Sequence, residues 1–315
     1  MTIRVVIMSD EIGWHTRQLQ AALRARGAVG RCVDLAACQI DTTAAWHGLV
    51  IPGYGRELPD AVLVRGIAGG SFEQVTKRLG VLHALRELGV PVYNDARAIE
   101  RSVDKSMTSL LLHAARIPAP ATWATESAAQ ARRIVMRETA AGHALVLKPL
   151  FGSQGKDLQL VGEVDGVQHP MPDIGARYAG LASLQRFVPP VASPGFDWRV
   201  MVVGMRAVTA MRRVSAHWIH NVAQGARCVP AVLAPGPARL AAGAAGALAM
   251  DYAGVDLIAA ASGPPVQVLE VNGVAAWQGL QRVTGFNIAR AIVDDLIDRK
   301  LAQAGRVPGR ERRAG

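Results

Sequence analysis

Hydrophobic residues follow two spacings in turn near the start of the chain, and this alternation predicts a parallel α/β domain. Short apolar or β-branched runs at 3–8, 61–64 and 90–93 have the length of buried strands. Residues 72–88 carry apolar side chains at helical spacing and lie between two of these runs. Strands that alternate with helices form a parallel sheet covered on both faces. We therefore expect a Rossmann-like α/β domain over residues 1–95.

The pattern changes after Pro120. Before it, residues 97–116 have the pattern of one helix, and the segment 117–120 is extended because proline disfavours helix at the residue before it. Residues 128–141 are again helical. Short strands with turn signals then follow closely: 144–148, 157–161, 183–188, 198–203 and 206–212. This part is an antiparallel α+β region, and we expect 163–180 within it to be a surface loop that carries no chemistry.

A glycine-rich segment, VLKPLFGSQGKDLQLV at 146–161, follows a strand that ends in Lys148. Glycines let main-chain N–H groups approach an anion closely, and successive turn amides form a concave site for phosphate. The pattern differs from a P-loop, in which the lysine follows the glycines and opens a helix. Two interpretations remain open from these residues: a phosphate-binding hairpin, or an ordinary Gly/Ser hairpin with a surface lysine.

Two apolar runs within residues 255–272, separated by a Ser/Gly/Pro turn, predict an antiparallel hairpin. Centring it on Gly263 places Asp256 opposite Glu270, with Cβ atoms ~5 Å apart. Asn272 then points to the same face as Glu270. Opposed carboxylates repel unless a cation lies between them, and two carboxylates with an amide oxygen suit Mg²⁺. The alternatives are an exposed acidic face or a carboxylate pair that shares one proton; zinc is disfavoured because no His or Cys is near in sequence.

The composition is basic, with 35 Lys and Arg against 25 Asp and Glu and a formal net charge of +10. Basic surfaces attract nucleic acid, but only five of these residues are lysines, and the arginine excess is typical of a GC-rich coding bias. Three scattered cysteines argue against a disulfide framework or a structural zinc site. The N-terminus lacks the pattern of a signal peptide, and the apolar stretch 240–250 is too short to span a bilayer. We expect a cytoplasmic protein with no membrane partner.

Several segments, in a fixed order, resemble the ATP-grasp superfamily. They are Asp104-Lys105 at a helix start, LLLHAARIPAP, VLKPLFGSQGKD, QRFV at 185–188, Asp197-Trp198-Arg199, GVDLI and LEVNG. Within the superfamily the chain is most similar to RimK-type ligases, which include those that glutamylate tetrahydromethanopterin-like cofactors and those that act on amino-group carriers in lysine biosynthesis. Residues 213–225 resemble their R-x-S-x-x-W-I-T-N…G stretch, with His220 in place of the usual threonine. The resemblance covers about residues 95–300.

The resemblance implies an ATP site, a metal site and two catalytic side chains. The ATP site would comprise Lys105, Lys148, the loop residues Gly152, Ser153, Gln154 and Gly155, the adenine linker Gln185, Arg186 and Phe187, Asp197 near the ribose, and Asn221 near the phosphates. The metal site, for two Mg²⁺ ions with Mn²⁺ as the alternative, would comprise Asp256, Glu270 and Asn272. The catalytic side chains would be Lys148, which contacts the nucleotide phosphates, and Arg213, which would stabilise charge on the transferring phosphoryl group or on the acyl phosphate. A one-residue shift would exchange Arg213 with Arg212.

The implied reaction is the ADP-forming coupling of a phosphate-activated carboxylate to the amine of an amino acid. Glutamate is the expected amino acid, and a one-carbon-carrier cofactor is the expected small-molecule acceptor. One alternative is addition to a peptide or protein C-terminus or a carrier protein, and another is a nucleotide-binding regulator with a basic nucleic-acid-binding surface. The complete lysine and metal set argues against the regulator. The resemblance also implies a homo-oligomer.

The expected organisation is an ATP-grasp fold, α/β and α+β, with an N-terminal pre-ATP-grasp domain. We expect this domain at 1–95, an ATP-grasp subdomain with the glycine-rich loop at 96–185, a metal-binding subdomain at 186–302, and a disordered tail at 303–315.

Overall fold

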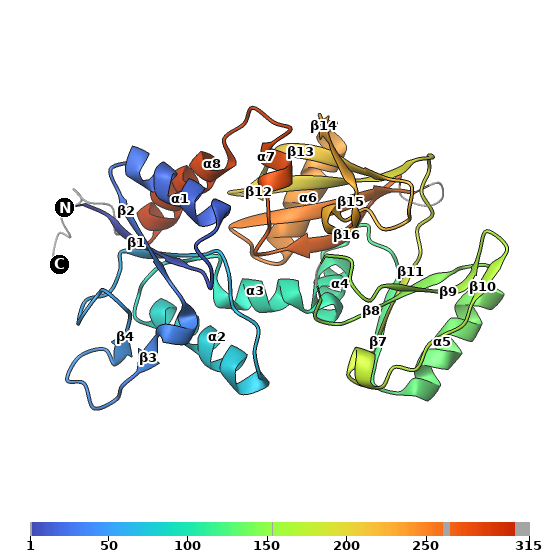
Figure 1. Cartoon of the computed structure of the whole chain (residues 1–315), viewed down its shortest axis with the longest axis horizontal. Helices are drawn as coiled ribbons and strands as arrows, with labels where there is room; N and C mark the ends of the chain where they lie inside the picture. The colour runs from blue at the N-terminus through green and yellow to red at the C-terminus, as the bar shows by residue number, and fades with distance from the viewer. Residues whose placement is uncertain (1, 153, 261–264, 306–315) are drawn as a thin grey trace.

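The computed structural model describes residues 2–152, 154–260 and 265–305, and its strands form three main sheets that follow one another along the molecule (Figure 1). The first sheet is parallel, in the order β2-β1-β5-β6. Its strands are β1 (Arg4–Met8), β2 (Val29–Val33), β5 (Ala61–Val64) and β6 (Val92–Tyr93). The predicted α/β domain is confirmed, although the pattern of polar and apolar residues did not indicate β2 or the small hairpin of β3 (Gln39–Ile40) and β4 (Leu49–Val50).

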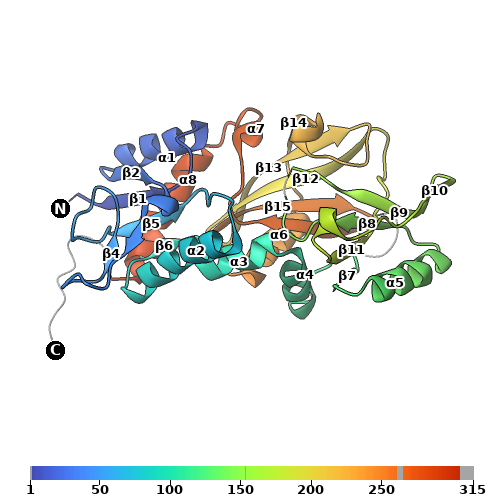
Figure 2. The ribbon, with the colours of Figure 1, turned by 60° about the horizontal axis from the view of Figure 1, so that its bottom comes forward.

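Helices cover both faces of this sheet because alternate strand residues point to opposite sides. Val5 and Ile7 face α1 (Trp14–Ala25), whereas Val6 and Met8 face α2 (Phe72–Glu87) and α3 (Ala96–Val103). Figure 2 shows these two helical layers on either side of the strands.

The last helix of the chain packs on this first domain. Helix α8 (Ile288–Asp295) continues as a π-helix, η4 (Leu296–Leu301), and lies against α1. Its buried Ile292 and Leu296 belong to the same cluster as Leu19 and Leu23 of α1. The cluster also contains Met201 and Trp277, so it joins the first sheet to the third.

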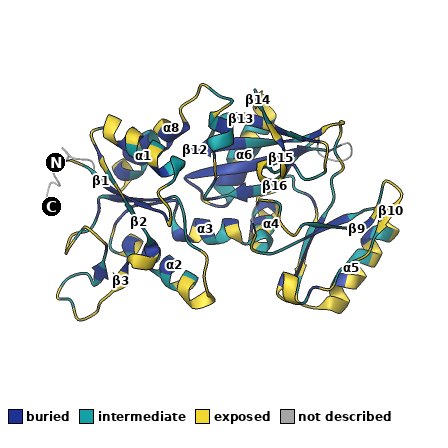
Figure 3. Ribbon diagram, in the orientation of Figure 1, coloured by how far each residue is buried: buried dark blue, intermediate teal, exposed yellow. Residues whose placement is uncertain are grey.

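The second sheet is antiparallel, in the order β10-β9-β8-β11-β7, and one helix backs it. Its strands are β7 (Thr122–Thr125), β8 (Leu145–Lys148), β9 (Gln159–Val164), β10 (Val167–His169) and β11 (Ala182–Arg186). Helix α5 (Ala128–Ala140) covers the face that carries Leu145 and Leu147 and exposes its other side to solvent (Figure 3). The opposite face of the sheet carries Lys148 and Gln185.

The third sheet is also antiparallel, in the order β14-β13-β12-β15-β16. Its strands are β12 (Gly195–Val203), β13 (Arg206–Ser215), β14 (Arg227–Ala231), β15 (Tyr252–Ala259) and β16 (Val266–Asn272). The alanine-rich helix α6 (Pro235–Ala247) covers one face through Ala241, Ala244 and Ala245, with α4 (Lys105–Ala114) beside it. The remaining short elements are η1 (Leu35–Ala37), η2 (Ala176–Tyr178), η3 (Val222–Gln224) and α7 (Gln278–Gln281).

Two expectations about local structure are wrong. The helix expected over 97–116 is two helices, because Asp104 ends α3 and its carboxylate caps α4 by accepting from the amides of Ser106 and Met107. The expected loop 163–180 contains strand β10 and helix η2, and its Ile174 and Tyr178 are buried under the second sheet.

Residues 303–305 finish the last helix in a turn, and the rest of the expected disordered tail, 306–315, lies outside the described residues.

Candidate active site

The open face of the third sheet carries a row of charged side chains. Asp197 and Arg213 are direct partners on β12 and β13, and Arg199, Asp256 and Glu270 lie opposite one another across β12, β15 and β16. The predicted pairing of Asp256 with Glu270 is confirmed. On the turn side of this pair the register shifts by one, because Leu257 pairs with Val268 and leaves a bulge at the residue between Val268 and Glu270.

Four of these groups form a buried ion-pair network. Arg213 donates to both carboxylate oxygens of Asp197, at 2.8 and 2.5 Å, and its Nη2 lies 3.0 Å from Asp256 Oδ2. Arg199 also donates to both oxygens of Asp256, from Nη2 at 2.9 Å and from Nε. Arg213, Asp197 and Asp256 are each less than 5% exposed. The neighbouring Arg212 instead lies over the ring of Phe196, so the structure places Arg213, and not Arg212, in the network.

The network sets the protonation of its two acids in opposite directions. Burial raises the pKa of Asp197 to about 6, against the attraction of Arg213. Burial alone would also raise the pKa of Asp256, but the guanidinium groups of Arg199 and Arg213 outweigh it and hold that pKa below its usual value. Asp256 is therefore the carboxylate kept ionised at the centre of the sheet.

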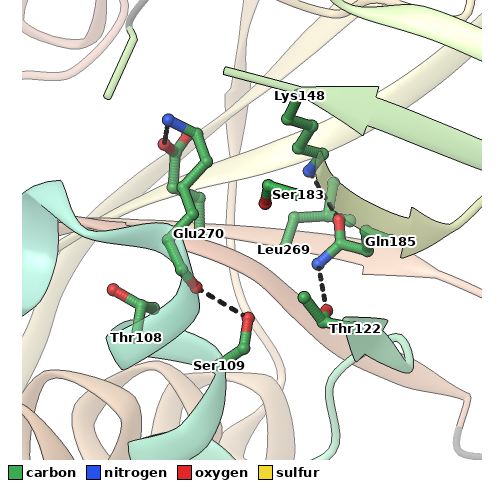
Figure 4. A pocket seen from close by; sticks show the side chains of 9 residues that line it. Thr108, Ser109, Thr122, Lys148, Ser183, Gln185, Leu269 and Glu270 are labelled. Carbon is green, nitrogen blue, oxygen red and sulfur yellow. Dashed lines mark hydrogen bonds and ion pairs between the residues drawn. The ribbon is translucent and has the colours of Figure 1, made fainter. Parts of the chain in front are cut away.

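The second sheet and helix α4 complete a pocket beside Glu270 (Figure 4). Lys148 from β8 donates to Gln185 Oε1 at 2.5 Å, and Gln185 donates to Thr122 Oγ1 at 3.3 Å. Lys105, the first residue of α4, places its Nζ 4.0 Å from Glu270 Oε1. The pocket is lined by Lys105, Thr108, Ser109, Thr122, Lys148, Ser183, Gln185, Leu269 and Glu270. Two ammonium groups from different elements thus meet one carboxylate.

Lys148 is held in this pocket against the preference of a charged group for water. Burial, with a smaller contribution from the nearby Lys105, lowers its pKa to about 8, although Glu270 and Asp256 partly compensate. An anion in the pocket would interact favourably with the positive charges of both ammonium groups. The surroundings of the two lysines therefore suit phosphate oxygens.

The glycine-rich loop lies against the segment that follows β13. A Cβ atom added to Gly155 would lie 2.7 Å from Asn221 Oδ1 and 2.8 Å from Ile219 Cγ2, and Gly155 has a φ of +71°. Gln224 Nε2 donates to the carbonyl of Gln154 at 3.2 Å, and Lys105 Nζ donates to that of Gly152 at 3.0 Å. The structure thus brings Gly152, Gln154, Gly155 and Asn221 together beside the lysines; Ser153 lies outside the described residues.

Part of the predicted adenine linker forms main-chain hydrogen bonds within or beside the second sheet. The main-chain amides of Arg186 and Phe187 donate to the carbonyls of Ala121 and Ala144. The Arg186 guanidinium pairs with the buried Glu138 at 2.6 Å. The Phe187 ring packs edge-on against Trp218, with ring centroids 5.8 Å apart.

The predicted metal ligands fit a cation unequally. Glu270 lies in the pocket. Asn272 donates its amide N–H to the carbonyl of Gly254 at 3.1 Å, and this orientation leaves its amide oxygen available to coordinate a metal ion. Both carboxylate oxygens of Asp256 already accept from arginine. Over 2–152, 154–260 and 265–305, no three His, Cys, Asp or Glu side chains cluster to hold a metal by themselves. Oxygen donors of this kind suit Mg²⁺ shared with phosphate oxygens, with Glu270 and Asn272 as the better placed ligands.

Sequence reasoning assigned no role to Arg199, although its spacing of two from Asp197 puts both on one face of β12. It is this arginine, with Arg213 and Lys105, that offsets the repulsion between Asp256 and Glu270. Their opposition therefore does not by itself require a metal ion, and the metal site stays a prediction. His220, at the position where the family has threonine, is 4% exposed, and burial lowers its pKa to about 4.

Two antiparallel sheets that cover their outer faces with helices and share a lysine-lined pocket between them define the ATP-grasp class of ligases. The chain belongs to the RimK-like ATP-grasp family. Residues 102–296 match the model of the RimK-like ATP-grasp domain, and residues 3–99 match that of the RimK PreATP-grasp domain. The protein is accordingly an ATP-dependent carboxylate–amine ligase, and ATP-grasp ligases use ATP and Mg²⁺.

Named relatives cover almost the whole chain. The tetrahydromethanopterin:alpha-L-glutamate ligase of Methanosarcina acetivorans is 29% identical, over 92% of this chain and 97% of its own. A probable alpha-L-glutamate ligase of Legionella pneumophila is 30% identical, over 93% and 94%.

Among solved structures, the ATP-grasp ligase PsnB in complex with its precursor peptide PsnA2 and AMPPNP superposes with a TM-score of 0.68 at 22% identity, over 95% of this chain and 97% of that one. A RimK domain ATP-grasp protein from Sphaerobacter thermophilus gives 0.66 at 21%, over 97% and 100%. These likenesses show the fold. Within the described residues, the structure contains no helix with the length and hydrophobicity of a membrane span.

Proposed function

We propose that this ligase joins the α-amine of L-glutamate to a carboxylate of a small-molecule acceptor of the one-carbon-carrier type. The observation that supports the ATP-dependent step is the convergence of Lys105, Lys148 and Glu270 in the pocket between the two sheets. The names of the relatives from Methanosarcina and Legionella support glutamate as the amino acid.

The reaction has two steps, and the charged residues act mainly in the first. A carboxylate oxygen of the acceptor attacks the γ-phosphorus of ATP, the bond to the β–γ bridging oxygen breaks, and ADP leaves. The glutamate amine then attacks the carbonyl carbon of the resulting acyl phosphate. The amide bond forms as the bond to phosphate breaks, and inorganic phosphate leaves. Phosphoryl transfer depends on positioning and charge neutralisation, so no nucleophilic serine or cysteine is required.

Each charged group has a place in this scheme. Lys105 and Lys148 would hold the phosphates, and the glycine-rich loop, whose Gly152 carbonyl accepts from Lys105, would lie beside them. Glu270 and Asn272 would hold Mg²⁺, which would further neutralise the phosphate charge, and Asp256 lies opposite Glu270 on the neighbouring strand. Arg213, fixed by Asp197, directs its positive charge towards the same face of the sheet.

The test of the function is amino-acid-dependent release of ADP. The protein is incubated with ATP, Mg²⁺, single amino acids and a small-molecule cell extract, and new amide-linked masses are identified by mass spectrometry. We expect L-glutamate to give the largest increase in ADP and a product heavier by one glutamyl residue. A product found only when peptides are supplied would move the acceptor to the peptide class. ADP release that no amino acid increases would overturn the proposed substrate.

Glu270→Gln tests the metal assignment. Loss of one negative charge from the ligand set should lower kcat by at least ~100-fold, because the metal loses its main anchor. The exposed Glu126, at the loop before α5, gives the matched control Glu126→Gln, which should leave kcat unchanged. Both variants should unfold at the wild-type temperature. Wild-type kcat in Glu270→Gln would contradict the metal site.

A further inference from the structure

A second cluster of polar groups lies where the first sheet meets the chain leaving β16. Arg65 directly follows β5, and its amide donates to the carbonyl of Met8 at the end of the neighbouring β1. Its guanidinium carbon lies 5.3 Å from the ring centroid of Trp277, and Nη1 is 3.5 Å from the carbonyl of Val274. The carboxyl ends of adjacent parallel strands are where open α/β sheets bind ligands.

Two buried donors in this cluster, Arg65 Nε and Trp277 Nε1, lack acceptors. Within the described residues, no carboxylate forms an ion pair with Arg65, and its buried Nε has no hydrogen-bond partner. Trp277 is 1% exposed, and its indole Nε1 is also buried without a partner. Buried donors without acceptors are costly, so their presence together points to a ligand that accepts hydrogen bonds.

The neighbouring titratable groups do not supply this acceptor. His15 accepts from the main-chain amide of Trp277 at 3.1 Å, and burial together with Arg65 lowers its pKa to about 4, so it is a neutral ring that supports Trp277. Tyr252, packed edge-on against Trp277, donates its hydroxyl to the carbonyl of Val64. The exposed Asp10 lies beside Gly66 and not on the guanidinium.

The cluster is close to the reaction site along the chain. Val274 comes four residues after Glu270, so at ~3.3 Å per residue the two main-chain positions are at most about 13 Å apart. A small substrate bound at Arg65 can therefore place another group at the phosphate end of the ATP pocket.

We propose that Arg65, whose guanidinium lies over the ring of Trp277, binds a carboxylate of a non-nucleotide substrate. This inference rests on the proposed function, because it assigns a binding group to a substrate of that reaction. The planar guanidinium matches a carboxylate with two parallel hydrogen bonds, and stacking on the indole restricts its orientation before the substrate arrives. The carboxylate belongs either to the incoming amino acid or to the acceptor, and the two sources can be told apart.

The experiment is calorimetric titration of the whole protein, preloaded with AMPPNP and Mg²⁺, with L-glutamate and with the dicarboxylates succinate and glutarate. We expect Arg65→Gln to weaken binding of L-glutamate at least 10-fold. The affinity of Arg65→Lys should lie between those of the wild type and Arg65→Gln, since an ammonium keeps the charge but cannot form two parallel hydrogen bonds. Trp277→Phe should weaken it a few-fold. Arg24→Gln, on the exposed side of α1 in the same domain, is the control and should bind like the wild type.

The affinity for AMPPNP and the unfolding temperature distinguish substrate binding by Arg65 from a purely structural role. Both should stay unchanged in Arg65→Gln. Wild-type binding of every carboxylate by Arg65→Gln would overturn the proposal, and so would a wild-type protein that binds none of them. A third result is that the wild type binds a dicarboxylate but not glutamate, and that Arg65→Gln no longer binds the dicarboxylate. Arg65 would then bind a carboxylate of the acceptor, and the assignment to glutamate would be wrong. Loss of wild-type binding on replacing L-glutamate by its α-amide assigns the α-carboxylate of the amino acid.

Discussion

Lys148 has two properties that oppose each other in the ligand-free protein. Its ammonium is needed for phosphate, yet burial lowers its pKa to about 8, so the folded protein holds a charge that water would solvate better. Functional sites often keep such groups at the expense of stability. The same residue should therefore affect nucleotide binding and stability with opposite sign.

Substitution of Lys148 by methionine should weaken AMPPNP binding by about 10–100-fold, because a charge-assisted hydrogen bond is lost. It should also stabilise the ligand-free protein at pH 7 by about 1 kcal/mol, because the desolvated charge is removed. Titration calorimetry and thermal unfolding measure the two effects. The exposed Lys156, at the end of the same loop, supplies the control Lys156→Met, expected to change neither by much. A destabilised Lys148→Met would contradict the account of its burial.

The pH dependence of nucleotide binding follows from the same pKa. Bound phosphate favours the ammonium form, so the pKa of Lys148 is higher in the complex than the value of about 8 in the free protein. Between these two values the complex holds a proton that the free protein has lost. Affinity for AMPPNP should therefore fall as pH rises above about 8 and stay nearly constant from pH 7 to 8. In Lys148→Met this fall should disappear; a wild-type affinity independent of pH up to 9.5 would refute the assignment.

Single residues show how far the sequence could lead. Lys148, Asp256 and Glu270 could be found because strand spacing fixes the face on which a side chain lies. The resemblance also named Arg213, but the pairing of Asp256 with Arg199 and Arg213 could not be predicted, since these arginines come from strands whose order in the sheet the local pattern does not reveal. The site was thus predictable as a set of residues, but not as an ion-pair network.

Among the elements, the glycine-rich loop is defined by a contact across the pocket. Gly155 has a left-handed φ and approaches Asn221 so closely that a side chain would collide with it. The loop can therefore lie over the lysines only with glycine at this position.

Gly155→Ala should raise KM for ATP at least ~10-fold, because the added methyl group forces the loop away from Asn221. Substitution of Gly166 is the control that distinguishes the effect of this contact from that of backbone strain. Gly166 also has a positive φ, +76°, but no atom lies within 4 Å of a Cβ added to it. Gly166→Ala should lower stability slightly, by about 1 kcal/mol, and leave KM unchanged. Equal KM values in both variants would mean that the contact with Asn221 has no role in binding.

Elements were predictable where their patterns are regular and self-contained. The runs that became β1, β5 and α2 have clear spacing and end signals. The break between α3 and α4 was missed because Asp104 interrupts an otherwise continuous helical pattern with a cap. The segment 163–180 was missed because its polar composition hides Ile174 and Tyr178, which only the packing under the second sheet reveals.

At the scale of the whole molecule, one apolar cluster connects distant parts of the chain. It contains strand residues of the first and third sheets and the buried side of α8, so the first domain and the third sheet share a core. The boundaries expected at 95 and 302 divide the sequence but not this core.

Ile292→Ala, in the middle of α8, should lower the free energy of unfolding by about 3 kcal/mol, because the side chain is fully buried. Hydrogen exchange should then increase in both β1 and β12, which line the cluster. Ile174→Ala, a matched substitution under the second sheet, should increase exchange in β8 and β11 only. Protection of β1 that is unaffected by Ile292→Ala would show that the two sheets do not share a stabilising core.

The position of α8 on the first sheet has a consequence for how the protein is made on the ribosome. Helix α1 is translated long before α8, the helix that covers its apolar side. At 5–20 residues per second, the interval between Ala25 and Ile288 lasts roughly 10–50 s. During this time Leu19 and Leu23 have no partner from α8, and the nascent first domain is a natural client for chaperones that hold apolar surfaces. The first domain can thus complete its core only after α8 has been translated.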